Sequence, residues 1–422
     1  MEPRRACGFG ALDSSPARRR PVRRKDGESA GYSAAMAENG RPASRTRRRT
    51  MQILKNPRRD PQLAPLPWSE RMFAAARDAE AWLALCPSHR PTPLVRWQPW
   101  QDTGPTLWLK DETQRMRAGS FKALGGAYAV MQLALAAARR VEPGLGLREL
   151  VAGAGRAGPQ LEVCCASAGN HGLSVAIGAR LVGCRCTVFV AQTVPESFVQ
   201  RLQSAGASVV RAGAHYEASM AAAQAHAERP GIELVSDSSW PGYTEVPLLI
   251  MAGYLRIPRE AMDEAAQRGV AFTHVLVQAG VGGLAAAVGA ALRAQPGDTR
   301  RLIVVEPEVA DCLSASAAAG RIVEVSGPAS NMGRLDCKRP SMIAYELLAP
   351  ACDDWITLGD DEAARGTALL QPLIGSTPSG AAGVAAALLA WSDENRREQL
   401  GLTPQSQLLC FVTEQSQGSP IP

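Results

Sequence analysis

The sequence predicts an α/β protein with two domains, and three features of the chain lead to this prediction. Short apolar runs typical of strands alternate with helix-like segments rich in Ala and Leu from about residue 62 onward. The 422 residues are sufficient for two hydrophobic cores. Two loops of small residues each follow a predicted strand and precede a predicted helix. This alternation favours parallel sheets with helices on both faces.

The predicted elements are short and regularly spaced. Strand-like runs occupy residues 106–109, 161–166, 186–190, 208–211, 233–236, 274–278, 302–306 and 408–413. Helix-like segments occupy residues 123–140, 171–182, 195–205, 215–228 and 283–294. The Gly-rich segment 141–160 is predicted to be a loop. Because ligands of parallel sheets bind at the carboxyl ends of strands, the loops that follow these strands are candidate sites.

The basic charge of the chain is confined to its N-terminal segment. The net charge is +6, but residues 1–59 contain 16 Lys or Arg against 5 Asp or Glu, so the remaining residues carry a net negative charge. Residues 1–61 have few large apolar side chains and are predicted to be a disordered tail, or the product of a start site placed before Met36 or Met51. We expect no specific nucleic-acid site. A nucleic-acid binder acting through the tail is the rival from another class.

The composition predicts neither a membrane span nor a metal centre. No apolar run is long enough to cross a bilayer without charges or turn residues. The ten cysteines lack companion histidines at metal-ligand spacing. Buried free thiols in a reducing compartment explain them, so we expect a cytoplasmic protein without disulfides or bound metal.

Lys122 is the first candidate for chemistry. It follows Ser120 and Phe121, where a loop turns into an apolar, Ala-rich helix. An ammonium group is poorly solvated in such a place, whereas a neutral amine can form a Schiff base with an aldehyde cofactor and later act as a base. A lysine at a helix start is more often structural than catalytic, so this hypothesis needs support from elsewhere in the chain.

The loop 167–172, with the sequence SAGNHG, gives part of that support. It follows the predicted strand 161–166 and precedes a helix. Its small residues allow backbone amides to approach an anion such as a substrate carboxylate, and the helix N-terminus favours negative charge. Asn170 could donate a hydrogen bond to a ring oxygen of a cofactor. An ordinary strand-to-helix turn has the same pattern, so the loop alone does not decide between the two interpretations.

A second loop, 278–284 with the sequence QAGVGGL, also lies between an apolar strand and an Ala-rich helix. Glycines at this spacing expose consecutive N–H groups at a helix N-terminus, which suits a phosphate group. A dinucleotide site is the rival interpretation. The final glycine of that fingerprint and the acidic residue on a following strand are missing, so a phosphate of another cofactor is favoured.

In this order, the lysine and the two loops resemble the fold-type II pyridoxal-phosphate enzymes, the family of threonine dehydratase, serine racemase and tryptophan synthase β. The resemblance narrows to diaminopropionate ammonia-lyase over about residues 62–415. The segments that carry it are 90–94 (RPTPL), 110–115 (KDETQR), 121–129 (FKALGGAYA), 237–247 (DSSWPGYTEVP), 304–312 (VVEPEVADC) and 379–381 (SGA).

The resemblance implies two α/β domains, as in tryptophan synthase β. Residues 62–135 and 262–422 would form a discontinuous larger cofactor-binding domain, and residues 136–261 a smaller inserted domain. The resemblance also implies pyridoxal 5'-phosphate as cofactor, a small amino acid as substrate and a homodimeric assembly.

The resemblance also assigns roles to individual residues. Lys122 would carry the cofactor and remove the α-proton of an L-substrate, with Asp237 near the substrate amino groups. Asn170 would contact the ring oxygen, and the neutral hydroxyl of Thr413 would face the pyridine nitrogen, which suits elimination over transamination. The phosphate would be held by Gly280, Val281, Gly282, Gly283 and Leu284. The substrate would be bound by Ser167, Ala168, Gly169 and His171.

Three departures from the family pattern bear on the substrate. Ammonia-lyases that accept both enantiomers have an aspartate where this chain has Ala168, and a methyl group cannot accept a proton. Pro378 replaces an acidic residue, and Lys338 and Arg339 replace Gly-Glu. These changes make the site more positively charged, which could favour a substrate with an acidic side chain over one with a second amine.

The predicted activity is therefore the α,β-elimination of a small amino acid resembling L-2,3-diaminopropionate, giving ammonia and a 2-oxo acid such as pyruvate. The alternatives are a serine or threonine dehydratase, an eliminase for another β-substituted amino acid, and a homologue that binds pyridoxal phosphate without turnover.

Overall fold

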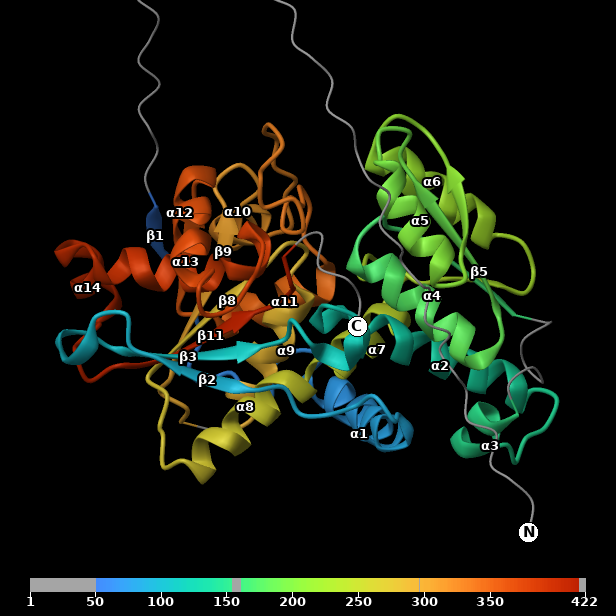
Figure 1. Cartoon of the computed structure of the whole chain (residues 1–422), viewed down its shortest axis with the longest axis horizontal. Helices are drawn as coiled ribbons and strands as arrows, with labels where there is room; N and C mark the ends of the chain where they lie inside the picture. The colour runs from blue at the N-terminus through green and yellow to red at the C-terminus, as the bar shows by residue number, and fades with distance from the viewer. Residues whose placement is uncertain (1–50, 154–160, 296, 417–422) are drawn as a thin grey trace, which may run out of the picture. The chain divides into compact units, whose positions relative to one another are not determined.

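A computed structural model describes residues 51–153, 161–295 and 297–416, which belong to one compact unit. Two sheets organise this part of the chain (Figure 1). Residues 1–50, the greater part of the predicted tail, lie outside the described residues.

The larger sheet has seven strands, of which the five central ones are parallel. The two edge strands, β1 and β2, run antiparallel to their neighbours. In sheet order the strands are β1 (Gln52–Lys55), β10 (Asp354–Leu358), β9 (Arg301–Pro307), β8 (His274–Gln278), β11 (Gln407–Val412), β3 (Thr106–Asp111) and β2 (Leu94–Trp97). The central strands are almost continuously apolar because helices cover both of their faces.

The smaller sheet has four parallel strands. In sheet order they are β6 (Ser208–Arg211), β5 (Arg185–Val190), β4 (Glu162–Ala166) and β7 (Ile232–Leu234). These strands lie within the predicted inserted domain, and the strands of the larger sheet lie outside it. The boundaries at residues 135 and 261 stay a prediction.

Fourteen α-helices and three short 3₁₀ helices occur among the described residues. The α-helices are α1 (Ser69–Leu85), α2 (Gly126–Arg139), α3 (Leu147–Ala152), α4 (Asn170–Val182), α5 (Glu196–Ser204), α6 (Tyr216–Ala227), α7 (Glu245–Tyr254), α8 (Arg256–Gln267), α9 (Gly283–Leu292), α10 (Cys312–Ala319), α11 (Met342–Ala351), α12 (Asp360–Leu370), α13 (Pro378–Trp391) and α14 (Glu394–Leu400). The 3₁₀ helices are η1 (Gln101–Thr103), η2 (Arg115–Arg117) and η3 (Phe121–Leu124).

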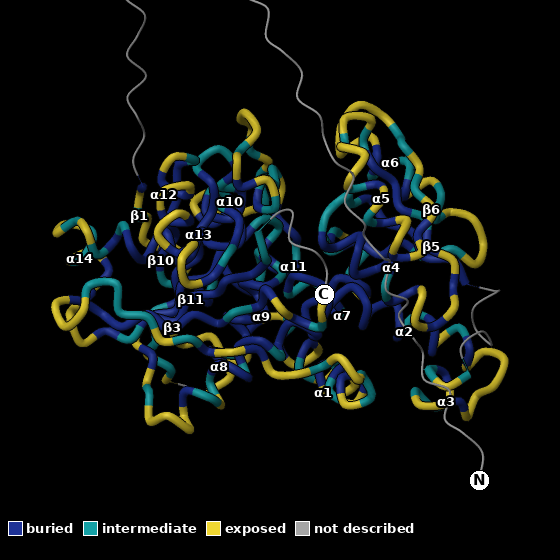
Figure 2. The backbone as a smooth tube through the Cα atoms, viewed as in Figure 1, coloured by how far each residue is buried: buried dark blue, intermediate teal, exposed yellow. Residues whose placement is uncertain are grey.

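Helices form a layer on each face of both sheets. Along β8, Val275 and Val277 join one apolar cluster with α9, whereas Leu276 joins another with α12 and α13. In the smaller sheet, Val163 and Cys165 pack on the α4 side and Cys164 on the α6 side. This alternation places the largest buried regions between the sheets and their helices (Figure 2).

All eight predicted strands are present, with boundaries shifted by no more than two residues. The missed strands are β1, β2 and β10. β1 lies inside the segment 1–61 that was predicted to be disordered, so that prediction is wrong for residues 51–61. The reason is tertiary pairing: Gln52 lies opposite Thr357, and the Met51 amide donates to Glu362 Oε1 at 3.0 Å. The predicted loop 141–160 is also partly wrong, since α3 lies within it; its residues 154–160 fall outside the described range.

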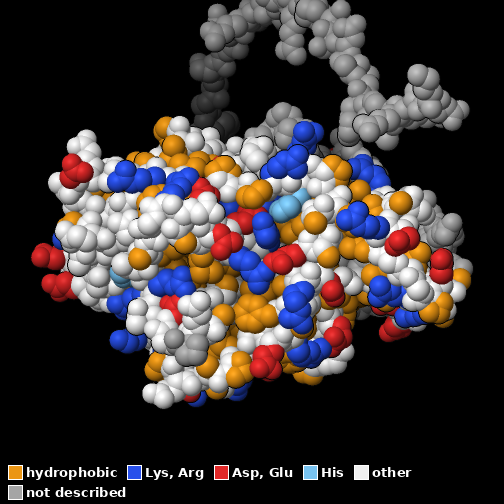
Figure 3. Space-filling view, turned by 90° about the horizontal axis from the view of Figure 1, so that it is seen from below, with side chains coloured by type: hydrophobic (Ala, Val, Ile, Leu, Met, Phe, Trp, Pro, Cys, Tyr) orange, Lys and Arg blue, Asp and Glu red, His pale blue; other side chains and the backbone are white. Residues whose placement is uncertain are grey.

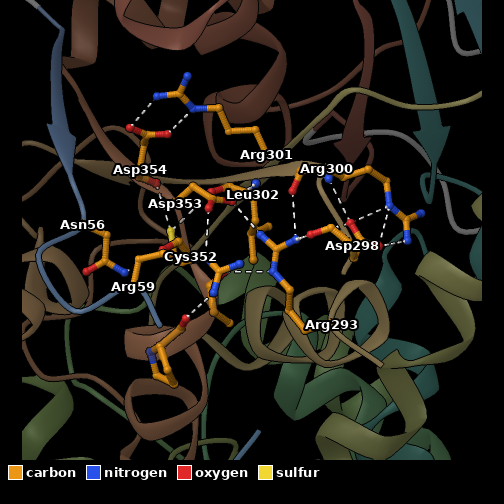
Figure 4. Close-up of polar contacts among 12 residues, drawn as sticks. Asn56, Arg59, Arg293, Asp298, Arg300, Arg301, Leu302, Cys352, Asp353 and Asp354 are labelled. Atoms are coloured by element: carbon orange, nitrogen blue, oxygen red, sulfur yellow. Dashed lines mark hydrogen bonds and ion pairs between the residues drawn. The ribbon is translucent and has the colours of Figure 1, made fainter. Parts of the chain in front are cut away.

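A network of charges fixes the segment after β1 at the amino ends of β9 and β10 (Figure 4). Arg59 Nε lies 2.9 Å from Asp353 Oδ1, and Arg293 Nη2 lies 2.5 Å from Asp353 Oδ2. Asn56 Nδ2 donates to the carbonyl oxygens of Ala349 and Cys352 at 2.8 and 2.6 Å. The network lies at the strand ends opposite to the candidate loops, so we interpret it as structural.

Among the described residues, one apolar stretch, Phe121–Arg139, is long enough to cross a membrane by length and composition, and most of it is buried inside the protein. It contains η3 and α2, and α2 packs against α4 and α7. These features are typical of a helix in a protein core.

Figure 3 shows one face of the surface, on which Lys and Arg side chains are interspersed with Asp and Glu. This face lacks the continuous positive surface that favours binding to a nucleic-acid backbone.

Candidate active site

The predicted site segments all follow parallel strands at their carboxyl ends. The loop with Asn170 follows β4, Asp237 follows β7, the glycine loop follows β8, and Thr413 follows β11. η3, which contains Lys122, is joined to the end of β11 because the Phe121 amide donates to the Thr413 carbonyl at 3.1 Å. The carboxyl ends of both sheets therefore contribute to one region, as expected for ligand sites in parallel sheets.

Lys122 and Asp237 form a direct ion pair although they are 115 residues apart in the sequence. The Lys122 Nζ atom lies 2.5 Å from Asp237 Oδ2, and the two side chains are 21% and 20% exposed. The Phe121 and Tyr254 rings flank Nζ, with centroids at 5.3 and 5.7 Å. The lysine is therefore held between a carboxylate and two aromatic rings, with limited access to solvent.

The ion pair moves the pKa values of Lys122 and Asp237 in opposite directions. Burial is the largest single effect and lowers the pKa of Lys122, but the charge of Asp237, the charge of Tyr254 and the hydrogen bond to Asp237 together bring this pKa well above its ordinary value. Burial raises the pKa of Asp237, but Lys122 and then His171 bring it well below its ordinary value. Both groups are therefore charged at neutral pH in the protein without cofactor. Lys122 must lose a proton before it can act as a nucleophile or base.

The polar groups of the loop before α4 have defined partners. The Ser167 hydroxyl accepts from the Gly169 amide at 3.3 Å, and His171 Nε2 lies 2.8 Å from the Val235 carbonyl. That carbonyl can only accept, so Nε2 carries the hydrogen and Nδ1 is an acceptor without a partner among the described residues. Burial lowers the pKa of His171, which keeps the ring neutral. Ala168 is partly buried and packs against the main apolar cluster.

The glycine loop is shaped by close contacts. Gly282 has a φ of +99°, and a methyl group there would lie 2.9 Å from Ala344 Cβ. A methyl group on Gly280 would lie 3.0 Å from Cys337 Sγ. Gly283 is the first residue of α9, and Leu284 packs into the core. Val281 accepts a hydrogen bond from the Ser341 amide at 3.0 Å through its carbonyl. The loop thus ends at the N-terminus of α9, a position that favours a negatively charged group.

We expect Gly282→Ala to weaken cofactor binding by about tenfold or more, since strain and crowding would cost more than about 1.4 kcal/mol. Titration of the cofactor-free protein with pyridoxal phosphate, followed by absorbance, measures this change. Gly269→Ala is the matched control, because Gly269 has a φ of +68° but no atom within 4 Å of the added methyl. Equal loss of cofactor affinity in both variants would contradict the assignment of the loop.

Thr413 lies in a defined hydrogen-bond arrangement. Its hydroxyl accepts from Gln278 Nε2 at 3.2 Å, and the same Nε2 lies 2.7 Å from the Gly380 carbonyl. Because the hydroxyl oxygen already accepts, its own O–H remains available as a donor. A donor of this kind suits a pyridine nitrogen that carries no proton.

Two residues near these loops were not among the predicted site residues. Glu414 is buried; its Oε1 accepts from Thr377 Oγ1 at 2.5 Å, and its Oε2 accepts from Asn170 Nδ2. Arg334 lies against Gly169. Glu414 directly follows the predicted Thr413 in the sequence, and this position could have indicated that it lies near the site. Arg334 comes from a segment without regular structure, and its sequence neighbours give no indication of the site.

The departures from the family pattern have local explanations. Pro378 is the first residue of α13, where proline is favoured, and the Thr377 hydroxyl caps this helix through the Gly380 amide. Lys338 Nζ lies 2.6 Å from Asp336 Oδ1 and also donates to the carbonyls of Val309 and Pro328. Arg339 is exposed. Lys338 therefore adds no free positive charge to the site.

The donor set fits pyridoxal phosphate better than a metal ion. Lys122 has an amine that can form a Schiff base, the glycine loop has backbone amides at a helix N-terminus, and Thr413 has a hydroxyl with a free donor. In the described part of the chain, no group of three or more His, Cys, Asp or Glu side chains could hold a metal ion, and the nine cysteines there are free thiols.

Comparison with known proteins identifies the class. Residues 85–414 match the family of pyridoxal-phosphate dependent enzymes, and the chain belongs to this family. Its fold is that of the fold-type II members and its cofactor is pyridoxal phosphate.

Within this class, the chain is similar to diaminopropionate ammonia-lyase of Escherichia coli strain K12, with 31% identity over 319 residues, 73% of this chain and 79% of the relative. A crystal structure of the Escherichia coli enzyme in complex with D-serine has a TM-score of 0.77 and 28% identity, and the match covers 87% of this chain and 94% of that one. The L-threonine ammonia-lyase of Thermotoga maritima is 28% identical over 228 residues, 54% of either chain.

Proposed function

We propose that this protein is an ammonia-lyase that eliminates ammonia from L-2,3-diaminopropionate or a closely similar amino acid. The observation that carries the proposal is the contact between Lys122 and Asp237 at the carboxyl ends of the two sheets. The similarity to diaminopropionate ammonia-lyase over most of the chain supports it.

The cofactor, when bound, acidifies the α-proton of an attached amino acid by withdrawing electrons. Lys122 Nζ would hold the cofactor and, once freed by the substrate, accept the α-proton. Asp237 would attract the amino groups of the substrate and compensate the charge of protonated Lys122. The amides of Gly280, Val281, Gly282, Gly283 and Leu284 would hold the phosphate group.

The remaining residues would orient the two molecules. Asn170 would donate to the ring oxygen, and Thr413 would donate to the pyridine nitrogen. The loop Ser167, Ala168, Gly169 and His171 would receive the substrate carboxylate at the N-terminus of α4. In the overall reaction, one diaminopropionate and one water give one pyruvate and two molecules of ammonia.

This stoichiometry provides the test of the proposed function. Ammonia and pyruvate are measured with L- and D-2,3-diaminopropionate, serine, threonine and hydroxyaspartate. The proposal requires L-2,3-diaminopropionate to have the highest kcat/KM, with two molecules of ammonia for each pyruvate. A preference for L-serine or L-threonine, with one ammonia for each oxo acid, would show a dehydratase. No turnover of any of them would indicate a homologue that only binds the cofactor.

Ala168 makes the stereochemical part of the proposal testable. Wild type should act on the L-isomer alone, because the loop offers no base in place of the missing aspartate. Ala168→Asp should add turnover of D-2,3-diaminopropionate by on the order of 10²-fold or more over wild type, the usual contribution of a placed base. Ala168→Asn, which has a similar size but no basic group, should not. Equal rates for the two isomers in wild type would contradict this assignment.

We also propose that the enzyme is a homodimer located in the cytoplasm. The family resemblance supports the dimer, and the free thiols of the described residues support a reducing compartment. Light scattering of the purified protein and cell fractionation measure these two properties.

A further inference from the structure

Arg334 is held directly over the loop that precedes α4. Its main-chain amide donates to Ser379 Oγ at 3.1 Å, which fixes the backbone to the first turn of α13. A methyl group built on Gly169 would lie 3.4 Å from Arg334 Nη1 and 3.5 Å from Cζ. The Arg334 guanidinium group therefore lies next to Gly169, the residue of the loop that has no side chain.

The guanidinium group has hydrogen-bonding capacity left. Arg334 Nε lies 3.6 Å from Glu414 Oε2, beyond hydrogen-bond distance, and is buried without a partner among the described residues. No hydrogen bond from either Nη atom to the described residues occurs; the group instead lies over the Phe198 ring, 5.4 Å from its centroid. An arginine offers five N–H donors in a plane, which matches a carboxylate.

Glu414 does not fully compensate this charge. Its two oxygens already accept from Thr377 and Asn170, and a second arginine lies nearby: Arg201 Nη1 is 3.5 Å from Asn170 Oδ1. Burial and then the charge of Arg334 lower the pKa of Arg201, which shows that the two cations influence each other. Two guanidinium groups thus share one carboxylate, and the region retains a net positive charge.

Arg334 also lines a pocket on the side of α13. This pocket has a volume of about 340 Å³ and is lined also by Thr377, Ser379 and Glu414. The Asp237 carboxylate, once Lys122 is bound to the cofactor, provides a negatively charged group for a substrate ammonium, whereas Arg334 provides a positively charged group at the loop. This charge pattern is complementary to an amino-acid zwitterion.

We propose that Arg334 binds the α-carboxylate of the substrate, together with the backbone amides of residues 167–171. The proposal rests on the proposed function, because it places an amino acid between Lys122 and this loop. Arg334 would then be a residue that determines which substrates the enzyme binds.

The test is a binding measurement that does not require elimination. Holoenzyme is titrated with L-alanine, which has no leaving group, and with L-alaninamide and L-aspartate, while the absorbance of the bound cofactor is followed. Arg334→Gln should weaken L-alanine and L-aspartate by about 10- to 100-fold, the range for lost hydrogen bonds to a charged group. It should leave L-alaninamide within about twofold.

Lys338→Gln is the matched control, because Lys338 is a nearby cation of similar exposure whose charge is already compensated by Asp336. It should change none of the three affinities. Arg334→Lys keeps the charge but loses the planar pair of donors, and should have an intermediate effect. Cofactor content and thermal unfolding of each variant establish that it is folded.

Three results would overturn the proposal. Loss of L-aspartate binding, with L-alanine binding unchanged, would show that Arg334 binds a side-chain carboxylate. Unchanged or tighter binding of L-alanine to Arg334→Gln would show that the arginine only covers the loop. Absence of any cofactor response to L-alanine in wild type would show that the carboxylate site does not exist. None of these results depends on ammonia release, so failure of the proposed elimination is recognised separately.

Discussion

Lys122→Ala should reduce ammonia release from the preferred substrate by on the order of 10³-fold or more, since the amine would both hold the cofactor and move the α-proton. Pyridoxal phosphate should still bind through the glycine loop and Thr413, but reduction with borohydride should no longer attach it to the protein. Steady-state ammonia release and the mass of the reduced protein measure the two effects.

Lys338→Ala is the control for this substitution, because Lys338 is also partly buried but its ammonium group is paired with Asp336. It should retain activity and covalent attachment of the cofactor. Full ammonia release by Lys122→Ala, or borohydride attachment at another lysine, would refute the role of Lys122.

The ion pair with Asp237 gives the protein without cofactor a defined pH range of stability. The raised pKa of Lys122 contributes stability that is fully present below its ordinary value of 10.5 and is lost as pH rises through the folded value. The lowered pKa of Asp237 contributes stability that is fully present above its ordinary value of 3.8 and is lost as pH falls through the folded value. Covalent attachment of pyridoxal phosphate to Lys122 must therefore disrupt an ion pair that is intact at neutral pH.

Glu260→Gln should lower the free energy of unfolding by about 3–5 kcal/mol, because it removes one partner from a buried charge network. Glu260 Oε2 lies 2.7 Å from Lys110 Nζ and 2.7 Å from Arg115 Nη2, and these three side chains are at most 3% exposed. Glu112 pairs with Arg115 but not with Lys110, so the substitution leaves the Lys110 ammonium without its carboxylate. Denaturant unfolding measures the change.

The network also predicts a pH dependence. Burial raises the pKa of Glu260, but hydrogen bonds and charge from Arg115, and then Lys110, lower it to about 2 from an ordinary 4.5. A lowered carboxylate pKa contributes stability that is present above about pH 4.5 and is lost as pH falls toward 2. This part of the acid dependence should be absent in Glu260→Gln.

Glu264→Gln is the matched control for the network, since it lies one turn further along α8 and pairs with Arg268 near the surface. It should change the free energy of unfolding by no more than about 1 kcal/mol. If the two variants were equally stable, the network would contribute nothing beyond a surface pair.

The buried charge network contains residues from two of the sequence segments on which the family resemblance rests. Lys110, Glu112 and Arg115 belong to one motif, and Thr92 belongs to another. The Thr92 hydroxyl donates to Glu112, and its carbonyl accepts from Lys110. These residues support the sheet beneath the site and do not contact Lys122. A motif shared with a family can therefore reflect the scaffold as much as the chemistry.

Local patterns were sufficient for most of the fold. Strands buried on both faces are almost continuously apolar, so β8 and β9 are visible as short runs. β1 and β2 are edge strands of four residues, and too few of their side chains are buried to give such a pattern. β10 follows the apolar helix α11 closely, and the apolar run does not separate helix from strand.

The sequence by itself determined the class of the site. A lysine at a helix start and glycine loops between strands and helices are local features, because backbone conformation and exposed amides depend on neighbouring residues. Only the tertiary structure decided which groups meet: Lys122 with Asp237, Asn170 with Glu414, and Arg334 with Gly169. The physical reason is that charges and hydrogen bonds act over a few ångströms, and the distance between residues far apart in the sequence depends on how both sheets pack.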